Sequence, residues 1–184
     1  MRRFPLSLYV IFDAAVHPRV PLLYSDKSAA LYPLDASSVI FVPGVDRLVQ
    51  IKQEFIEEMV THAKADLPNE CCGILAGPDG KVMKVYRMSN VEASPFRFVM
   101  DPGELVQVDT EAGENGWELL AIYHSHTGSE AYPSDTDVRI AGGTAGLWPD
   151  VRYVLVSLMD MDDPSVRIFD ITNDVVTEEP LEVV

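Results

Sequence analysis

The chain has 184 residues, of which 47% are hydrophobic and 23% are charged, so it is long enough and apolar enough to bury a substantial core. These values exclude a disordered chain, a collagen and a disulfide-stapled miniprotein. Acidic residues outnumber basic ones 29 to 14, and the resulting net charge of −15 disfavours non-specific binding to nucleic acid or to an anionic membrane. We therefore expect no nucleic acid and no membrane among its partners.

The two cysteines, Cys71 and Cys72, are adjacent in the sequence. Neighbouring cysteines almost never form a strain-free disulfide, and the chain offers no third cysteine. The N-terminal apolar run is interrupted by Pro5 and Ser7, is closed by Asp13, and is too short to span a bilayer. The sequence thus predicts a protein of the reducing cytoplasm.

Residues 1–46 differ in character from the rest of the chain. They contain equal numbers of acidic and basic residues, so the whole net negative charge lies in residues 47–184. Five prolines punctuate this first segment, which allows short strands but no long helix. We therefore divide the chain into an N-terminal extension, residues 1–46, and a domain, residues 47–184.

Regular elements are predicted from about residue 50. Apolar residues recur at helical spacing over 50–65, which predicts an amphipathic helix that ends before Pro68. The apolar run 72–77 predicts a buried strand. A Pro-Asp-Gly turn then joins this strand to a second one over 81–88, as in a hairpin.

The second half alternates between helices and strands. Residues 89–100 are predicted to form a loop, and Asp101 is predicted to cap a second helix. Ser134 is predicted to cap a third helix, which the adjacent glycines at 142 and 143 weaken or end. Three further strands are predicted over 117–124, 152–159 and 166–171. Helices interleaved with hairpins predict an α/β protein with a mixed sheet.

His124 and His126 lie two residues apart at the end of a predicted strand. Side chains at this spacing project to the same face of the sheet, so both imidazoles can reach one ion. Asp137 follows on the first turn of the third helix. Two imidazoles and one carboxylate suit Zn²⁺ and leave a fourth coordination position for water, as in catalytic zinc sites.

Each of these residues also has a plainer interpretation. The two histidines can be merely exposed or hydrogen-bonded, and Asp137 can be the third-position acid of a capping box that begins at Ser134. Glu70 precedes the buried strand 72–77, where a partly desolvated carboxylate can serve as a general base. Its plainer interpretation is a solvated loop glutamate. The sequence pattern alone leaves these alternatives open.

The stretch from His124 to Asp137 fits the pattern H-x-H-x7-S-x2-D without a gap. Together with Glu70 and the glycines that follow it, this stretch resembles the JAMM (MPN+) metalloprotease family over about residues 48–184. The resemblance implies a cytidine-deaminase-like α/β fold with a mixed sheet flanked by helices. It also implies one zinc ion on His124, His126 and Asp137, with Glu70 as general acid/base. Ser134 is then expected to stabilise the tetrahedral oxyanion or to hold the metal-bound water.

Further stretches narrow the resemblance to the bacterial, particularly the actinobacterial, branch of the family. These are the runs FVMDPGEL at 98–105, EAYPS at 130–134 and VTEEP at 176–180. That branch includes the hydrolase that releases L-cysteine from the C-terminus of a small ubiquitin-like sulfur-carrier protein in a cysteine-making route. We therefore expect this chain to be a zinc peptidase whose substrate is such a carrier.

Two other functions fit the same residues. One is an isopeptidase that removes a ubiquitin-like modifier from lysine side chains, and the other is a non-catalytic MPN scaffold. Residues 1–46 have no counterpart in the family core, and the sequence leaves open whether they cover a sheet edge, mediate a homodimer or occlude the site. Elsewhere, His62 and Glu118 are predicted to lie on solvated faces.

Overall fold

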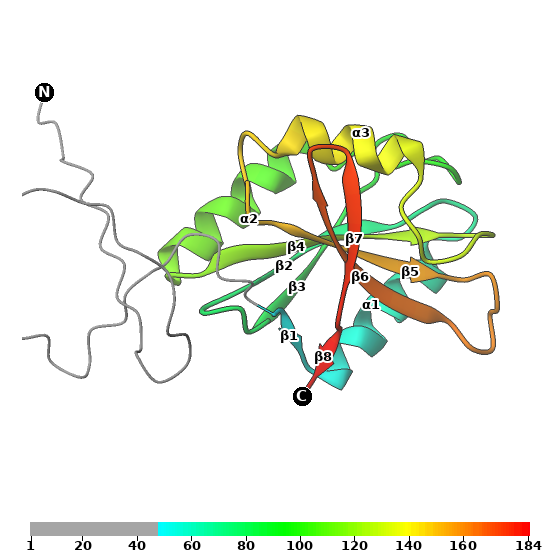
Figure 1. Cartoon of the computed structure of the whole chain (residues 1–184), viewed down its shortest axis with the longest axis horizontal. Helices are drawn as coiled ribbons and strands as arrows, with labels where there is room; N and C mark the ends of the chain where they lie inside the picture. The colour runs from blue at the N-terminus through cyan, green and yellow to red at the C-terminus, as the bar shows by residue number, and fades with distance from the viewer. Residues whose placement is uncertain (1–47) are drawn as a thin grey trace, which may run out of the picture. The chain divides into compact units, whose positions relative to one another are not determined.

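A six-stranded mixed sheet forms the centre of the part of the chain that the structure, a computed structural model, describes, residues 48–184 (Figure 1). The predicted N-terminal extension, residues 1–46, lies outside the described residues. The elements are β1 (Gln50–Ile51), α1 (Gln53–Ala65), β2 (Cys72–Gly77), β3 (Lys84–Met88), α2 (Pro102–Glu114), β4 (Glu118–His126), α3 (Asp135–Thr144), β5 (Arg152–Ser157), β6 (Ser165–Thr172), β7 (Val175–Glu179) and β8 (Glu182–Val183).

The strand order is β3-β2-β4-β5-β6-β7, and β4 and β5 are the one parallel pair in this sheet. A parallel pair needs a crossover connection, which here contains α3. The predicted mixed sheet is therefore confirmed. The crossover begins at the C-terminal end of β4, so α3 starts close to the last residues of this central strand.

The three helices cover the two faces of the sheet, α2 and α3 on one face and α1 on the other (Figure 1). Each face has its own apolar core. Because side chains alternate along a strand, neighbours in β2 and β4 enter opposite cores: Cys72 and Ile122 pack with α2 and α3, whereas Cys71 and Tyr123 pack with α1. None of the helices within residues 48–184 is long and apolar enough to cross a membrane.

Several predicted boundaries agree with the structure. The strand over 72–77 is β2, and the loop over 89–100 and the third helix after Ser134 are also present. Asp101 caps α2, since its Oδ1 accepts hydrogen bonds from the N–H groups of Gly103 and Glu104 at 2.8 and 3.0 Å. These features depend on residues close together in the sequence, which is why the local pattern predicts them.

Other predictions at the ends of elements are wrong. Residues 50–51 form a strand rather than the start of the helix, because β1 pairs in parallel with β8 near the C-terminus. The strand predicted over 117–124 ends at His126 instead, so it contains both histidines. By contrast, α3 ends at Thr144, one residue after the glycines at 142 and 143 that were predicted to weaken or end it. The sequence pattern also missed β7 and β8.

His62 is buried, contrary to its predicted position on a solvated face. It is 7% exposed, and its Nδ1 lies 2.8 Å from the hydroxyl of Tyr123 in β4. The ring of Tyr123 in turn covers Gly73, where an added Cβ would lie only 2.3 Å from it. Burial lowers the pKa of His62, although the carboxylate of Asp66 partly offsets this effect. The contact between His62 and Tyr123 fixes α1 against β4, the strand that carries His124 and His126. The other residue predicted to be solvated, Glu118, is exposed as predicted.

Candidate metal centre

The end of β4 and the first turn of α3 bring three predicted site residues together. His124 and His126 are the last two alternate residues of β4, and Asp137 is in the first turn of α3. Within residues 48–184 these three form the one group of acidic, histidine or cysteine side chains arranged to hold a metal ion, with their ligand atoms within 4.8 Å of one another. All three are buried, with exposed fractions of 0%, 6% and 4%.

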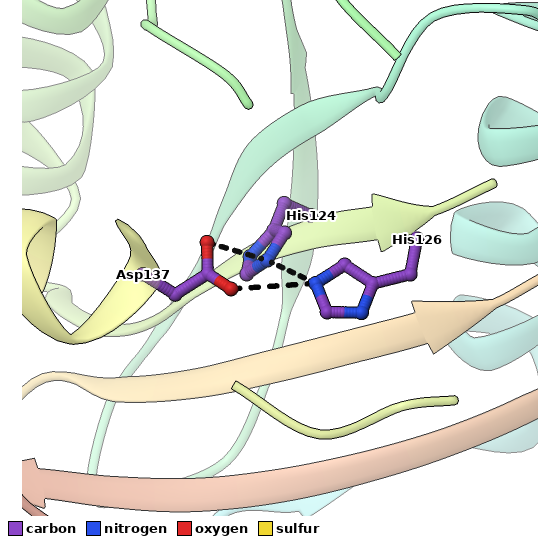
Figure 2. Close-up of side chains that lie close together, drawn as sticks. All are labelled: His124, His126 and Asp137. Carbon is purple, nitrogen blue, oxygen red and sulfur yellow. Dashed lines mark hydrogen bonds and ion pairs between the residues drawn. The ribbon is translucent and has the colours of Figure 1, made fainter. Parts of the chain in front are cut away.

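The two rings and the carboxylate point toward a common centre (Figure 2). The Nε2 atoms of His124 and His126 lie 3.3 Å apart. The carboxylate of Asp137 contacts both of them, Oδ1 at 3.2 Å from the Nε2 of His124 and Oδ2 at 3.3 Å from that of His126. Each imidazole nitrogen thus contacts its own oxygen of the carboxylate, and one ligand atom from each residue lies within 4.8 Å of the other two.

The separation of the two imidazole nitrogens fits a tetrahedral metal ion. Ligand atoms at about 2.0–2.1 Å from zinc in a tetrahedral arrangement are separated from one another by roughly 3.3 Å. The two Nε2 atoms lie 3.3 Å apart, and three protein ligands leave the fourth coordination position for a water molecule or a substrate oxygen. Two imidazoles and one carboxylate are also ligands that suit zinc in a catalytic site.

Hydrogen bonding within the group supports the same conclusion. The Nδ1 of His126 lies 2.8 Å from the carbonyl oxygen of Glu130, so this nitrogen carries a proton and donates it. A neutral ring in this tautomer turns the bare lone pair of Nε2 toward the carboxylate of Asp137. That contact is repulsive unless a proton or a metal ion lies between the two groups, so a cation stabilises the arrangement.

The ring of His124 is held by stacking instead. Phe98, from the loop before α2, stacks on it with a centroid separation of 4.6 Å and an interplanar angle of 27°. The Nδ1 of His124 is buried and has no hydrogen-bond partner among the described residues. Burial lowers the pKa of His124, which keeps the ring neutral and able to bind a metal.

Asp137 fits both of the interpretations between which the sequence pattern could not choose. It completes a capping box with Ser134: its Oδ2 accepts hydrogen bonds from the N–H and the hydroxyl of Ser134, both at 2.7 Å. Burial raises the pKa of Asp137, but the contacts of its carboxylate with His124, His126 and Ser134 outweigh burial and hold this pKa well below its usual range. The capping box therefore orients an ionised carboxylate toward the two histidines.

Glu70 lies at the same end of the sheet. The pairing of β2 with β4 places Cys72 opposite His124, and Ser125 donates its N–H to the carbonyl of Cys71, so Glu70 comes beside His126. Glu70 is 5% exposed, which rules out the interpretation as a solvated glutamate. Burial raises its pKa to about 7, a value suited to a group that both accepts and donates protons at neutral pH.

The two cysteines are not part of the metal-binding group. Both are fully buried and free, and Cys72 directs its Sγ toward the carbonyl oxygen of Met88 at 3.7 Å. Burial raises the pKa of Cys71 to about 12 and also raises that of Cys72. Both thiols therefore remain protonated and unreactive.

Comparison with known proteins finds relatives over most of residues 48–184. Residues 52–172 match the model of a family described as prokaryotic homologs of the JAB domain. A curated relative, the "CysO-cysteine peptidase" of Mycobacterium tuberculosis, is 42% identical over 144 residues, which cover 77% of this chain and 94% of the relative. The "probable TtuB-protein conjugate cleaving protease" of Thermus thermophilus is 30% identical over 125 residues, 67% of this chain and 78% of that protein.

The fold is also shared with solved structures. The solution structure of a protein from Desulfitobacterium hafniense superposes with a TM-score of 0.64 at 35% sequence identity. The match covers 74% of this chain and 92% of that protein. The sheet and its helices therefore follow an architecture already seen in a bacterial protein of similar sequence.

Proposed function

Because the chain belongs to the prokaryotic JAB family of JAMM-type metallopeptidases, we propose that it hydrolyses the amide bond at the C-terminus of a small ubiquitin-like sulfur-carrier protein and releases L-cysteine. One observation carries the proposal: two imidazole nitrogens and a carboxylate, close enough to share one metal ion, lie beside the buried Glu70, whose pKa burial raises to about 7. The relative named for acting on a carrier–cysteine bond supports this choice of substrate.

His124, His126 and Asp137 are the residues that hold zinc in this proposal. The chemistry that bound zinc supplies is Lewis acidity, which lowers the pKa of water from ~16 toward ~7 and polarises a carbonyl group. Zinc is favoured over calcium or magnesium because two of the three donors are imidazole nitrogens, which those hard cations avoid.

Glu70 moves the proton in this mechanism. Its carboxylate accepts a proton from the attacking water, whose oxygen forms a bond to the carbonyl carbon of the carrier's terminal residue. When the C–N bond breaks, Glu70 donates this proton to the departing nitrogen. The products are a carrier with a free carboxylate and the amino acid cysteine. The pKa of about 7 allows both transfers at neutral pH.

Ser134 is proposed to stabilise the negative charge that develops on the substrate oxygen. Its hydroxyl donates to the Oδ2 of Asp137, so it lies beside the metal-binding group. We expect Ser134→Ala to lower kcat by about 10²–10³-fold, the usual effect of losing one donor to an oxyanion. Steady-state kinetics with zinc analysis would check this, and a variant that loses zinc in proportion to its activity would assign Ser134 to holding Asp137 alone.

The decisive experiment uses the carrier itself. A sulfur-carrier protein bearing a C-terminal cysteine is incubated with the enzyme, with and without a chelator, and its intact mass is measured. We expect a loss of one cysteine residue when metal is present and no change with the chelator. An unchanged mass after incubation with a protein that carries one zinc per chain would reject the cysteine-releasing function.

The isopeptidase is the second candidate. It is favoured by the relative from Thermus thermophilus, whose name describes cleavage of protein conjugates. A carrier joined to a lysine side chain, tested beside the cysteine adduct, distinguishes the two. A larger kcat/KM for the lysine conjugate would make the isopeptidase the main activity, whereas neither substrate would be cleaved by a non-catalytic scaffold.

The remaining expectations from the sequence stay predictions. These are the cytoplasmic location, a homodimer, and the division between residues 1–46 and residues 47–184. Size-exclusion chromatography with light scattering of the full chain would test the homodimer directly.

A further inference from the structure

The side chain of Asn90, at the start of the loop between β3 and α2, makes four hydrogen bonds. Its Oδ1 accepts from the N–H groups of Glu92 and Val99 at 3.2 and 3.1 Å. Its Nδ2 donates to the carbonyl oxygens of Glu70 and Arg97 at 2.9 and 3.1 Å. An amide side chain offers two donors and two acceptor lone pairs, so Asn90 uses its full capacity. If the amide were reversed, its own oxygen would face the carbonyl oxygens of Glu70 and Arg97, and no hydrogen bond could form there. The reversed orientation is therefore excluded.

This network holds the backbone of Glu70 on both sides. The carbonyl of Glu70 accepts from Asn90, and the N–H of Glu70 donates to the carbonyl of Ser94 in the same loop at 2.9 Å. The buried Oε2 of Glu70 has no hydrogen-bond partner among the described residues. The loop therefore holds the main chain of Glu70 through two hydrogen bonds, one on each side of the residue.

The same loop also contacts the metal-binding group. Phe98 stacks on the ring of His124, and the hydroxyl of Thr127 donates to the carbonyl of Pro95 at 3.4 Å. A hydrogen bond from the N–H of Val91 to the carbonyl of Val99 at 2.9 Å closes the loop at its base. One loop thus connects the candidate base to the candidate ligands.

We propose that Asn90 is a positioning residue that holds Glu70 in its place beside the metal-binding group. The inference rests on the proposed role of Glu70 as general base. A base has to lie within hydrogen-bond reach of the proton that it accepts, and a displacement of about 1 Å can lower the rate by roughly 10²-fold. The amide of Asn90 prevents such a displacement because it joins Glu70 to the loop that packs on His124.

Two variants separate this role from a general effect on the loop. Asn90→Asp keeps the acceptors for Glu92 and Val99 but loses the donors to Glu70 and Arg97, whereas Asn90→Ala loses all four hydrogen bonds. We expect both variants to retain one zinc per chain and to lose roughly 10- to 100-fold in kcat, with KM changed by less than about threefold. The control is Asn115→Ala, which removes one side-chain hydrogen bond to the carbonyl of Glu111 at the end of α2.

A second measurement needs no substrate. Deuterium uptake at the amide of Glu70 is expected to rise about fivefold in Asn90→Asp, because Glu70 loses the hydrogen bond of about 1 kcal/mol that its carbonyl accepts from Asn90. Uptake at Val91, whose N–H bond closes the loop, is expected to stay unchanged in that variant.

The kinetic measurement uses whichever of the two carrier adducts the wild type cleaves, so failure of the cysteine-releasing function leaves the test of Asn90 intact. Wild-type kcat in zinc-loaded Asn90→Asp would overturn the inference, because the donor to Glu70 would then be dispensable. A loss of zinc that parallels the loss of activity would overturn it as well. A fall in kcat for Asn90→Ala alone would assign Asn90 to closing the loop and not to positioning Glu70.

Discussion

Glu70→Gln is expected to leave zinc bound while lowering kcat by at least ~10³-fold, toward the upper end of what general acid–base catalysis supplies. Glutamine has nearly the same shape as glutamate but cannot accept the proton of water or return it to the departing amine. The measurement is the intact mass of the carrier adduct over time, together with the zinc content of each variant. Glu118→Gln, an exposed glutamate on the strand that carries both histidines, is the matched control and should keep wild-type activity.

Loss of folding would not explain an inactive Glu70→Gln variant. The pKa of Glu70 is raised from its ordinary value of 4.5 to about 7 by burial, so the folded state binds this proton more tightly than the unfolded state does. In the metal-free protein the free energy of unfolding therefore falls as the pH rises from about 4.5 to about 7. Glutamine does not titrate and therefore removes this loss of stability, which is on the order of 3 kcal/mol above pH 7.

Thermal unfolding of the metal-free proteins at pH 5 and pH 8 checks this control. The variant should be at least as stable as the wild type at pH 8, and the difference should shrink at pH 5. A fully active, zinc-loaded Glu70→Gln protein would remove Glu70 from the mechanism.

His126→Ala is expected to lower the affinity for zinc by more than ~100-fold. Removing a residue that merely orients a zinc ligand typically costs 10- to 100-fold, so the loss of a ligand itself should cost more. The His126→Ala substitution removes one of the three proposed protein ligands, together with the hydrogen bond to the carbonyl of Glu130 that sets the tautomer of the ring. Zinc per chain, measured by mass spectrometry after dialysis against a weak chelator, should fall from one to near zero, and turnover should fall with it.

His62→Ala is the matched control for this substitution. His62 and His126 are buried to a similar extent, with exposed fractions of 7% and 6%, but His62 lies on the other face of the sheet and contacts Tyr123. Its loss should lower the melting temperature, because a buried hydroxyl loses its partner, yet leave zinc at one per chain. A folded His126→Ala protein that keeps its full zinc content would contradict the assignment of His126 as a ligand.

The sequence predicted those parts of the fold that are encoded within a few residues. The cap of α2 at Asp101, the buried strand 72–77 and the capping box from Ser134 to Asp137 each depend on neighbours three residues away or fewer, or on a continuous apolar run. The spacing of His124 and His126 likewise placed both rings on one face of a strand. These local rules were sufficient to name the mixed α/β sheet and the candidate ligands.

Contacts between distant segments could not be predicted in this way. The start of the first helix was misplaced because Gln50 and Ile51 pair with residues 182 and 183, more than 130 positions away. His62 was assigned to solvent because its helix position gives no sign of the tyrosine on β4 that covers it. In both cases tertiary contacts override the local pattern.

The candidate site also combines features that are encoded locally with features that depend on contacts between distant segments. The sequence by itself determined which residue types were available for zinc and for proton transfer, since their identities and spacing are local properties. Only the tertiary structure decided that Glu70 is buried beside His126, and that Asp137 serves the capping box and the metal-binding group together. The physical reason is that burial, and the pKa shift that follows from it, arise from strands and loops that meet only when the chain has folded.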